Sequence, residues 1–416
     1  MKTKAVRLYG VDDIRLDEFE LPEIKDDEIL VKVVSDSICM STWKTVKQGA
    51  NHKRVPNDVA DHPIIIGHEF AGDIVQVGKK WQDNFQPGQK FAQQPAIPGQ
   101  MESPGYSYAW CGGDTQYCIF PNDIIEAGCL WTFEGDGYFA SSVAEPVSCV
   151  IGGYHTNYHT VPGTYQHVMG TKKGGNIIIL GGCGPMGLGA ISYGLTFENK
   201  PKRIVVTEIN DERINRAREV ISEEEAAAHG VELIYVNTAT MQDQVKELMA
   251  LTDGKGYDDV FVYIPNRAVC EMGNSIMASD GCMNLFTGPT DMKFSSMINL
   301  YDCHYSRSKI IGSTGGTIDD MKEAIEKEAQ GLIKSAVMIT HVGGLDSVVE
   351  TTKNLPDVPG GKKLVYTHIN MPMTAIDDFA KLGEQDPFFK ELDAVCKKNR
   401  GLWSAEAEKM LLEHFR

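Results

Sequence analysis

The stretch that decides the fold covers residues 176–187, NIIILGGCGPMG. Its first five residues form a continuous apolar run, which is typical of a parallel strand covered on both faces. The glycines at 182, 184 and 187 have the spacing of a turn that bends tightly, approaches a phosphate closely and packs a helix against a strand. A helix-compatible stretch from Met186 to Phe197 follows. Strand, turn and helix in this order predict a dinucleotide-binding βαβ unit.

The acidic residue after the next strand-like run indicates which dinucleotide binds. Glu208 follows the apolar run 203–207. A carboxylate there accepts hydrogen bonds from both hydroxyls of the adenine ribose and repels a 2′-phosphate, so NAD is expected in preference to NADP. Arg213 leaves NADP possible, because it can stack on adenine or tolerate a 2′-phosphate if Glu208 swings away. The expected cofactor-binding residues are Gly182, Gly184, Pro185, Met186, Gly187, Glu208 and Arg213. The alternative is a glycine-rich turn without a ligand and a surface glutamate.

Strand and helix patterns continue to alternate beyond the turn. Apolar runs at 203–207, 233–236 and 259–263 alternate with helical stretches, and a charged helix is expected from Asp211 through Ala228. This alternation predicts an α/β fold with βαβ units and a doubly wound parallel sheet.

The N-terminal part of the chain has a different character. Short β-type runs at 29–34, 72–78 and 116–120 are bounded by Gly, Pro and Asp. They predict a small, mostly antiparallel, barrel-like unit. The longest irregular piece, from Gln93 to Gly113, is expected to be a surface loop or lobe.

The C-terminal tail, from Thr374 to Arg416, has a helical composition. It is expected to pack on its own subunit or on a neighbour. Together with the N-terminal unit it is expected to form a catalytic domain of residues 1–155 and 336–416, with the nucleotide-binding domain at 156–335 inserted between them.

The overall composition limits the class of protein. The chain has 416 residues, of which 42% are hydrophobic and 23% charged, as in globular proteins of two domains. A formal net charge of −17 argues against a nucleic-acid partner, since such partners require a basic face. The N-terminal residues are too polar for a signal peptide, and no apolar run approaches the ~20 residues of a membrane helix. The ten cysteines form no close framework, so a cytoplasmic protein with reduced thiols and no membrane partner is expected.

Three residues from separate stretches offer ligands for a metal ion. Cys39 and His68 each follow a strand-like run, and Glu145 is expected to lie at the start of a helix. A thiolate, an imidazole and a carboxylate suit Zn²⁺, and three protein ligands leave a fourth position for water or substrate. Taken singly, each residue also fits an ordinary role: Cys39 in the core, His68 as a hydrogen-bonded buried histidine, and Glu145 as a helix cap.

Several motifs resemble those of the medium-chain, zinc-dependent alcohol and polyol dehydrogenases, over nearly the whole chain. The segment 67–78, GHEFAGDIVQVG, is similar to the family's G-H-E-x-x-G element and its continuation, and residues 182–187 are similar to its cofactor turn. Glu145-Pro146 resembles the glutamate–proline pair that supplies a zinc ligand in the polyol branch. The resemblance implies a GroES-like catalytic domain and a Rossmann nucleotide-binding domain, assembled as a homodimer or homotetramer.

The resemblance also assigns roles to individual residues. It implies one catalytic zinc per chain, bound by Cys39, His68 and Glu145. It implies that Glu69 can enter or leave the coordination sphere of the metal. It further implies that Ser41, two residues after Cys39, relays the proton of the substrate.

The chain departs from the family pattern in three places. Thr42 replaces the Asp that usually follows the relay serine, and Trp43-Lys44 replaces a more common apolar–His pair. Many relatives carry four closely spaced cysteines for a structural zinc, whereas residues 95–113 contain only Cys111, with Cys118 beyond. Two thiolates without C-x-x-C spacing cannot close a tetrahedral site, so no structural zinc is expected. The stretch between Gly152 and Gly174 looks longer than usual, and a solvated loop is favoured there over a metal site. Its histidines are His155, His159 and His167.

Basic residues closely follow the metal and relay residues. They are Lys44, Lys47, His52, Lys53 and Arg54. Such side chains can neutralise a phosphate at the mouth of a substrate pocket. The expected phosphate contacts are Lys44, His52, Lys53 and Arg54. The alternative is a solvated loop whose charges have no consequence.

Together the motifs predict a zinc-dependent oxidoreductase that transfers a hydride between a nicotinamide cofactor and a polyol or ketose, in particular a sugar phosphate. An unphosphorylated polyol or alcohol is the alternative substrate. A zinc-free reductase of the same architecture, acting on quinones or enones, is the rival enzyme, and it would hold no tightly bound zinc. A dinucleotide-binding regulatory protein is the rival outside the enzymes, and it would show no NAD(H)-linked turnover.

Overall fold

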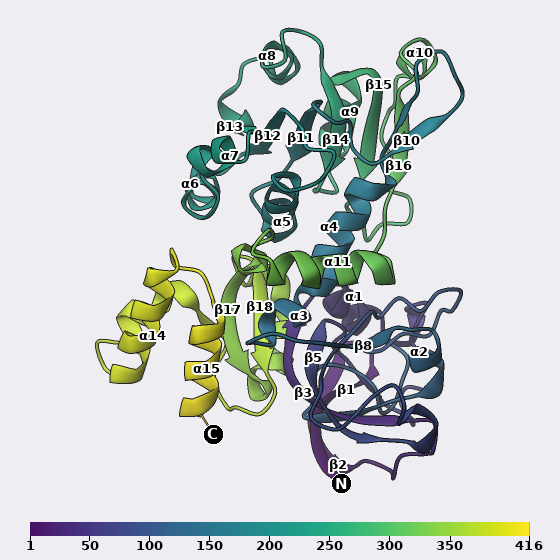
Figure 1. Cartoon of the computed structure of the whole chain (residues 1–416), viewed down its shortest axis with the longest axis vertical. Coiled ribbons are helices and arrows are strands. Elements are labelled where there is room, and N and C mark those ends of the chain that lie inside the picture. The colour runs from purple at the N-terminus through teal and green to yellow at the C-terminus, as the bar shows by residue number, and fades with distance from the viewer. Residues whose placement is uncertain (416) are drawn as a thin grey trace. The chain divides into compact units, whose positions relative to one another are not determined.

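The computed structural model describes residues 1–415 and divides the chain into two compact units (Figure 1). The first unit comprises residues 1–145 and the segment from Ile339 to the C-terminus, and the second comprises Pro146–Met338. The sequence places these boundaries after residues 155 and 335 instead. The first observed boundary falls within helix α4 (Ala144–Thr156), and because this helix is continuous no turn or change of composition marks it.

The first unit is built on two β-sheets. Its strands are β1 (Lys2–Gly10), β2 (Asp13–Glu20), β3 (Ile29–Ile38), β4 (Ile64–Ile65), β5 (Phe70–Val77), β6 (Lys90–Gln93), β7 (Tyr117–Phe120), β8 (Leu130–Phe133), β17 (Ile339–Gly344), β18 (Lys362–Tyr366) and β19 (Thr374–Ala375). One sheet has the order β2–β1–β4, and the other has the order β19–β17–β18–β3–β5–β6–β8, with β7 also paired to β3. Only β17 and β18 pair in parallel, which confirms the mostly antiparallel character expected from the sequence.

Strand β3 organises the first unit because it pairs with β18, β5 and β7. Nine of its ten residues are buried, the exception being the half-buried Lys32. β3 runs antiparallel to β5, with Asp36 opposite Phe70. Residues that follow β3 and residues that precede β5 therefore come to the same end of the sheet, and these are the segments that contain Cys39 and His68.

The C-terminal tail is helical, as predicted, and packs on its own unit. The helices of this unit are α1 (Met40–Gln48), α2 (Asn122–Glu126), α3 (Phe139–Ser142), α12 (Val348–Lys353), α13 (Phe379–Leu382), α14 (Pro387–Lys398) and α15 (Ala405–His414). Glu408 of α15 accepts hydrogen bonds from the backbone N–H groups of Tyr138 at 2.7 Å and Phe139 at 2.9 Å. It also accepts one from the Tyr366 hydroxyl at 2.9 Å. The tail is thus anchored through a buried carboxylate at the start of α3.

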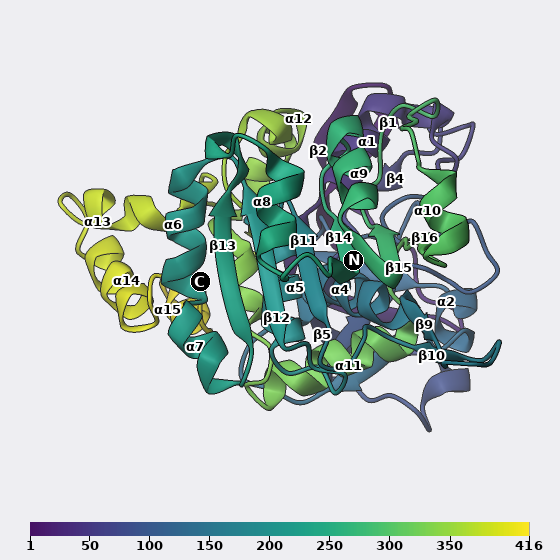
Figure 2. The same cartoon turned by 90° about the horizontal axis from the view of Figure 1, so that it is seen from above.

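The second unit contains a six-stranded parallel sheet in the order β13–β12–β11–β14–β15–β16. Its strands are β11 (Asn176–Leu180), β12 (Arg203–Glu208), β13 (Glu232–Asn237), β14 (Tyr257–Val262), β15 (Met277–Leu285) and β16 (Lys309–Gly312). Its other helices are α5 (Pro185–Gly194), α6 (Asp211–Val220), α7 (Glu223–Ala228), α8 (Gln244–Ala250), α9 (Arg267–Ser275), α10 (Leu300–Tyr305) and α11 (Ile318–Ala329). Figure 2 shows the sheet with helices packed along it. Two halves that diverge from a central β11 confirm the doubly wound sheet predicted from the sequence.

The charged helix expected from Asp211 through Ala228 is in fact two helices. α6 ends at Val220, where Ile221 adopts an extended backbone conformation. Ser222 then caps α7, and its side chain accepts a hydrogen bond from the backbone N–H of Glu225. The prediction of one helix was wrong because a serine N-cap inside a helical composition starts a new helix.

The prediction of a solvated loop between Gly152 and Gly174 was wrong for His155 and His159, whereas His167 is exposed, as predicted. His155 lies in the last turn of α4, and its Nδ1 lies 2.7 Å from Oδ1 of Asp320. His159 lies in β9 (Tyr158–Thr160), which pairs with β10 (His167–Met169). Its Nε2 lies 3.1 Å from Oδ1 of the buried Asp259. Hydrogen bonding to buried carboxylates orders this segment, and neither periodicity nor composition carries that information.

The segment from Gln93 to Gly113 contains no helix or strand after β6 ends, as expected for a lobe. It is not a solvated surface loop, because Gln94, Ser103 and Tyr106 are buried. Among the described residues, no helix combines the length and the apolar character that a membrane span needs.

Candidate metal and catalytic site

Cys39 is positioned by the end of β3. It is the N-cap of α1, and its Sγ accepts a hydrogen bond from the backbone N–H of Ser41 at 3.5 Å. Burial raises the pKa of the Cys39 thiol to about 12, and the nearby carboxylates of Glu69 and Glu145 act in the same direction. The thiol therefore keeps its proton at neutral pH unless a cation replaces that proton, as a bound metal ion does.

His68 follows Gly67 in the turn between β4 and β5. Gly67 has a φ of +87°, and a Cβ there would lie 2.1 Å from Oδ2 of Asp36, so the turn requires glycine. Nδ1 of His68 lies 3.3 Å from the Thr42 hydroxyl, and Nε2 lies 3.2 Å from the Tyr106 hydroxyl. The Thr42 contact orients the ring so that Nε2 faces the cluster. Burial lowers the pKa of His68 to about 4, so the imidazole is neutral, which is the form that binds a metal.

Cys39, His68 and Glu69 form the one group of at least three metal-binding side chains found among residues 1–415. Their ligand atoms lie within 4.8 Å of one another. A thiol, a neutral imidazole and a carboxylate at this spacing fit a zinc ion. The group contains Glu69 in place of the expected Glu145. Glu145 is the second residue of α4 and is half-buried.

Lys362 is a site residue that the sequence analysis does not identify. Its Nζ lies 2.5 and 2.7 Å from the two carboxylate oxygens of Glu69, and both side chains are buried. The Ser37 hydroxyl donates a further hydrogen bond to the same carboxylate. One signal was present, because Lys362-Lys363 opens the apolar run KKLVY, and a lysine in a buried strand requires an acidic partner.

A buried pair of carboxyl groups supports the turn that presents His68. Asp36 Oδ1 accepts hydrogen bonds from the backbone N–H groups of Ser37 at 2.7 Å and Glu69 at 3.1 Å. Asp36 Oδ2 and Asp114 Oδ1 are both buried without a hydrogen-bond partner among the described residues. Burial raises the pKa of both acids, that of Asp114 to about 7.

Ser41, the expected proton relay, lies in the first turn of α1. Its backbone carbonyl accepts a hydrogen bond from the Thr45 hydroxyl at 2.9 Å. Among the described residues its own hydroxyl has no hydrogen-bond partner, so that hydroxyl is available to a substrate.

The two cysteines of the structural-zinc region lie side by side. Cys111 and Cys118 are both buried, and burial followed by a hydrogen bond from Cys118 raises the pKa of the Cys111 thiol. Cys129 is also buried, and its Sγ lies 4.0 Å from the carbonyl oxygen of Ala96. The expectation that no structural zinc binds remains a prediction.

The basic residues that follow the relay serine are placed differently from one another. Lys44 is half-buried on α1, and Lys53 is exposed. Nζ of Lys47 lies 2.7 Å from Oδ1 of Asp12, so this lysine forms an ion pair with the β1–β2 turn.

His52 and Arg54 lie against Tyr106. The His52 ring stacks on the Tyr106 ring with a centroid distance of 5.6 Å and an interplanar angle of 15°. The Arg54 guanidinium carbon lies 5.3 Å from the centroid of the same ring. Because the Tyr106 hydroxyl contacts His68, these two basic residues approach the metal cluster through one phenol ring.

The glycine-rich turn of the second unit has the geometry of a dinucleotide site. Gly184 is the N-cap of α5, and Pro185 occupies the first turn. A Cβ on Gly187 would lie 2.2 Å from the carbonyl oxygen of Gly182, so the helix packs directly on the turn. A Cβ on Gly184 would meet no heavy atom within 4 Å. The start of α5, including Met186, is therefore open to a phosphate.

Glu208 ends β12 with its side chain 7% exposed. One carboxylate oxygen accepts a hydrogen bond from the backbone N–H of Ile209 at 2.8 Å. The other lies 3.8 Å from a guanidinium nitrogen of the exposed Arg213. The carboxylate that favours NAD and the guanidinium that leaves NADP possible are thus adjacent.

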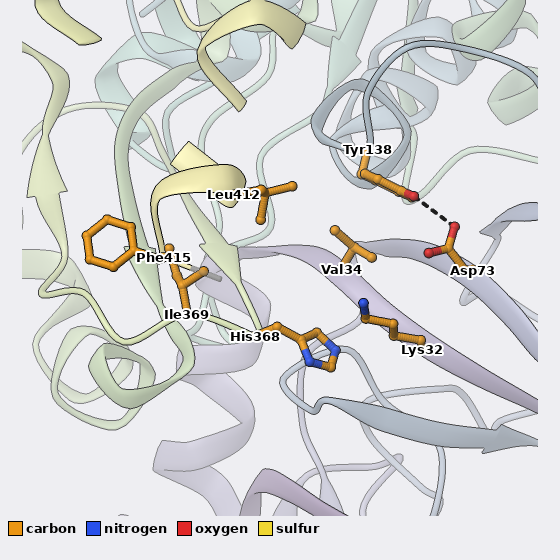
Figure 3. A pocket seen from close by; sticks show the side chains of 8 residues that line it. All are labelled: Lys32, Val34, Asp73, Tyr138, His368, Ile369, Leu412 and Phe415. Atoms are coloured by element: carbon orange, nitrogen blue, oxygen red, sulfur yellow. Dashed lines mark hydrogen bonds between the residues drawn. The ribbon is translucent and has the colours of Figure 1, made fainter. Parts of the chain in front are cut away.

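A separate cavity of about 130 Å³ lies beside α15 (Figure 3). It is lined by Lys32, Val34, Asp73, Tyr138, His368, Ile369, Leu412 and Phe415. The Tyr138 hydroxyl donates to Asp73 at 2.8 Å, and Lys32 is the cross-strand neighbour of Asp73. The charges of this wall balance one another, and its residues are not those of the metal cluster.

Comparisons with known proteins agree with the architecture. The alcohol dehydrogenase GroES-like domain matches residues 25–168, and the zinc-binding dehydrogenase domain matches residues 185–330. The solved structure of 2R,3R-butanediol dehydrogenase from Bacillus subtilis superposes with a TM-score of 0.71, covering 88% of this chain and 99% of that one at 20% identity. This likeness shows the fold.

Two relatives match over nearly their full length. The chain is 48% identical to mannitol-1-phosphate 5-dehydrogenase of Aliivibrio fischeri, covering 100% of this chain and 98% of the relative. It is 45% identical to L-sorbose 1-phosphate reductase of Klebsiella pneumoniae, covering 99% and 98% respectively. The chain therefore belongs to the zinc-binding, medium-chain alcohol dehydrogenase family, as an oxidoreductase of the polyol dehydrogenase type.

Proposed function

We propose that this chain is a zinc- and NAD-dependent dehydrogenase of hexitol phosphates, and that it interconverts a ketose phosphate and the corresponding hexitol phosphate. L-Sorbose 1-phosphate and D-glucitol 6-phosphate form the pair we favour. The observation that carries the proposal is the Cys39–His68–Glu69 cluster, in which the buried Glu69 carboxylate is paired with Lys362. The two full-length relatives support the substrate class, since both are named for six-carbon sugar phosphates.

We assign the zinc ion to Cys39, His68 and Glu145. When bound, zinc polarises the substrate oxygen and stabilises negative charge that develops on it. Because burial raises the pKa of the Cys39 thiol, the bound ion would be what makes it a thiolate, and the N-terminus of α1 would act in the same direction. Thr42 keeps the lone pair of His68 Nε2 directed into the cluster. Ser41 lies in the first turn of α1, two residues after Cys39. It is the group to which the substrate hydroxyl passes its proton.

We assign the pyrophosphate of NAD to the turn at 182–187 and the adenine ribose to Glu208. Support comes from the open start of α5 and from the buried carboxylate at the end of β12. A 2′-phosphate would meet the Glu208 charge, which favours NAD over NADP. Arg213 lies 3.8 Å from that carboxylate and would have to outweigh it for NADP to bind well.

We assign the substrate phosphate to basic residues of the segment 44–54. A phosphate ester carries close to two negative charges at neutral pH and requires compensation in a partly buried pocket. The proposed contacts are Lys44, His52, Lys53 and Arg54. We further propose that the chain acts in the cytoplasm as a homo-oligomer.

Initial rates test the proposal directly. The reduction of L-sorbose 1-phosphate, D-fructose 6-phosphate and L-sorbose is followed with NADH and with NADPH, and the oxidation of D-glucitol 6-phosphate, D-mannitol 1-phosphate and D-glucitol with NAD and NADP. The metal content of the same preparation is measured. We expect about one zinc per chain, activity with phosphorylated substrates, and a higher kcat/KM with the NAD pair.

Other outcomes would exclude the proposal or part of it. Equal kcat/KM values for sorbose and its phosphate would remove the phosphate specificity. Full activity without bound metal would favour the zinc-free reductase. Glu145→Ala should lose zinc and activity while NADH still binds, and a variant that retains zinc would reject Glu145 as a ligand.

A further inference from the structure

The segment from Gln94 to Gly113 places one aromatic residue beside the metal cluster. Gly105 has a φ of +76°, and a Cβ there would lie 2.0 Å from the carbonyl oxygen of Gly67. The backbone of the lobe is therefore packed against the turn that presents His68. Tyr106, the next residue, is buried, and its hydroxyl lies 3.2 Å from Nε2 of His68.

The same phenol ring supports two basic side chains. His52 stacks on it, and the Arg54 guanidinium carbon lies 5.3 Å from its centroid. The lobe also holds Arg54 from both ends. The Ser103 hydroxyl lies 3.2 Å from Nη1 of Arg54, and the Ser107 hydroxyl donates to the Arg54 carbonyl at 2.7 Å.

The charge of Arg54 is not balanced by the protein. Among the described residues, no carboxylate lies within ion-pair distance of its guanidinium. A half-buried arginine that serves only to close a loop is usually paired with an acid, because desolvation of an unpaired charge is costly. An anion that enters the pocket would complete its coordination.

We propose that Tyr106 is the residue that sets phosphate specificity, because its side chain contacts both Arg54 and Nε2 of His68. This inference rests on the proposed function and narrows it. Tyr106 is a positioning residue for Arg54, and Arg54 contacts the phosphate.

The same contacts predict where the phosphate is attached. The Arg54 guanidinium and Nε2 of His68 both contact the Tyr106 side chain. In a ketose 1-phosphate the carbon that bears the phosphate is bonded directly to the carbonyl carbon, whereas in fructose 6-phosphate the rest of the carbon chain separates the two groups. We therefore expect a 2-ketose whose phosphate is on carbon 1 to be preferred.

Variants at both positions test the proposal. Tyr106→Phe keeps the ring and its cation–π contact, whereas Tyr106→Leu removes them, and Arg54→Gln removes the charge. Lys47→Gln is the matched control, since it removes a basic charge from α1 that is already paired with Asp12. KM and kcat are measured for L-sorbose 1-phosphate and for L-sorbose.

We expect Tyr106→Leu and Arg54→Gln each to raise the KM for the phosphate about tenfold or more, the loss of one charge-assisted contact. The KM for L-sorbose should change less than twofold. Tyr106→Phe should retain the preference for the phosphate. The double variant Tyr106→Leu/Arg54→Gln should have the same KM for the phosphate as Arg54→Gln alone, because the ring acts through the guanidinium.

A binding measurement separates recognition from turnover. Inorganic phosphate is titrated by calorimetry into the zinc-depleted protein, and its Kd should rise in Tyr106→Leu and Arg54→Gln but not in Lys47→Gln. The proposal is overturned if Tyr106→Leu changes both substrates equally, or if wild-type protein prefers fructose 6-phosphate. If Tyr106→Leu fails to fold, as judged by circular dichroism, Arg54→Gln and Tyr106→Phe still decide the matter. Wild-type protein that reduces no ketose phosphate would instead refute the proposed function itself.

Discussion

Replacement of Lys362 by methionine should destabilise the first unit strongly. In the native protein the Lys362 side chain is 7% exposed and that of Glu69 is fully buried, and two contacts of 2.5 and 2.7 Å join them. Methionine fills a similar volume but leaves the carboxylate with the Ser37 hydroxyl as its remaining side-chain donor. Removal of one partner from a buried pair costs about 3–5 kcal/mol. We expect the free energy of unfolding to fall by about that amount.

The assay can be restricted to the unit that contains the pair. All five tryptophans lie in the first unit, at positions 43, 81, 110, 131 and 403. Urea unfolding followed by tryptophan fluorescence therefore reports on this unit without a contribution from the second, which avoids the mixed transitions of a two-unit protein. Each comparison is made with zinc-depleted protein and again with zinc, because bound metal adds its own stabilisation.

Two further variants make the experiment decisive. Lys397→Met removes an exposed lysine that pairs with Asp393 four residues earlier, and it should cost at most about 0.5 kcal/mol. The double variant Lys362→Met/Glu69→Gln removes both buried charges, so it should recover most of the lost stability. A loss below about 1 kcal/mol in Lys362→Met, or a double variant no more stable than the single one, would refute the idea that this lysine balances Glu69.

Three other perturbations have defined outcomes. Gly187→Ala should weaken NADH binding about tenfold or more in a fluorescence titration, since its Cβ would lie 2.2 Å from the Gly182 carbonyl oxygen and displace the turn; unchanged affinity would contradict the assigned cofactor turn. The hydrogen bond that His155 donates to the Asp320 carboxylate raises the pKa of His155, so this pair stabilises the fold below pH ~6.5 and loses its contribution as pH rises through the raised pKa. His155→Gln should therefore flatten the pH dependence of Tm, measured by calorimetry from about pH 5.5 to about pH 8.5, the range in which histidines titrate. Glu408→Ala removes the acceptor of three hydrogen bonds, so the free energy of unfolding seen by tryptophan fluorescence should fall by roughly 2–4 kcal/mol, and a native-like urea midpoint would count against an anchoring role.

The parallel sheet could be predicted strand by strand because burial on both faces leaves a continuous apolar run. The run 176–180 coincides with β11, and the run 203–207 falls one residue short of the end of β12. Helix boundaries were less predictable. The break after Val220 depends on a serine cap within a stretch whose composition remains helical on both sides, and propensity alone does not register such a change.

Cys39 and His68 could be predicted as neighbours because each follows a strand-like run and each matches a motif of the family. Lys362 could not, since it lies 293 residues from Glu69 along the chain. Its position depends on the register of β18 against β3, where Lys363 is opposite Ile38. Tyr106 could not be predicted either, because its segment has no periodicity and its placement follows from the close packing of Gly105.

Charge balance gives an independent argument for the proposed ligand set. With zinc bound, the thiolate of Cys39 and the carboxylate of Glu145 neutralise the two positive charges of the ion, while Lys362 neutralises Glu69. If Glu69 entered the coordination sphere and left Lys362, a buried ammonium group would lose its partner, at a cost of several kcal/mol. The ion pair therefore favours Glu69 outside the coordination sphere in the resting protein, although its ligand atom lies within 4.8 Å of those of Cys39 and His68. We therefore expect zinc content to respond to Glu145→Ala more strongly than to Glu69→Gln, as the proposed ligand set requires.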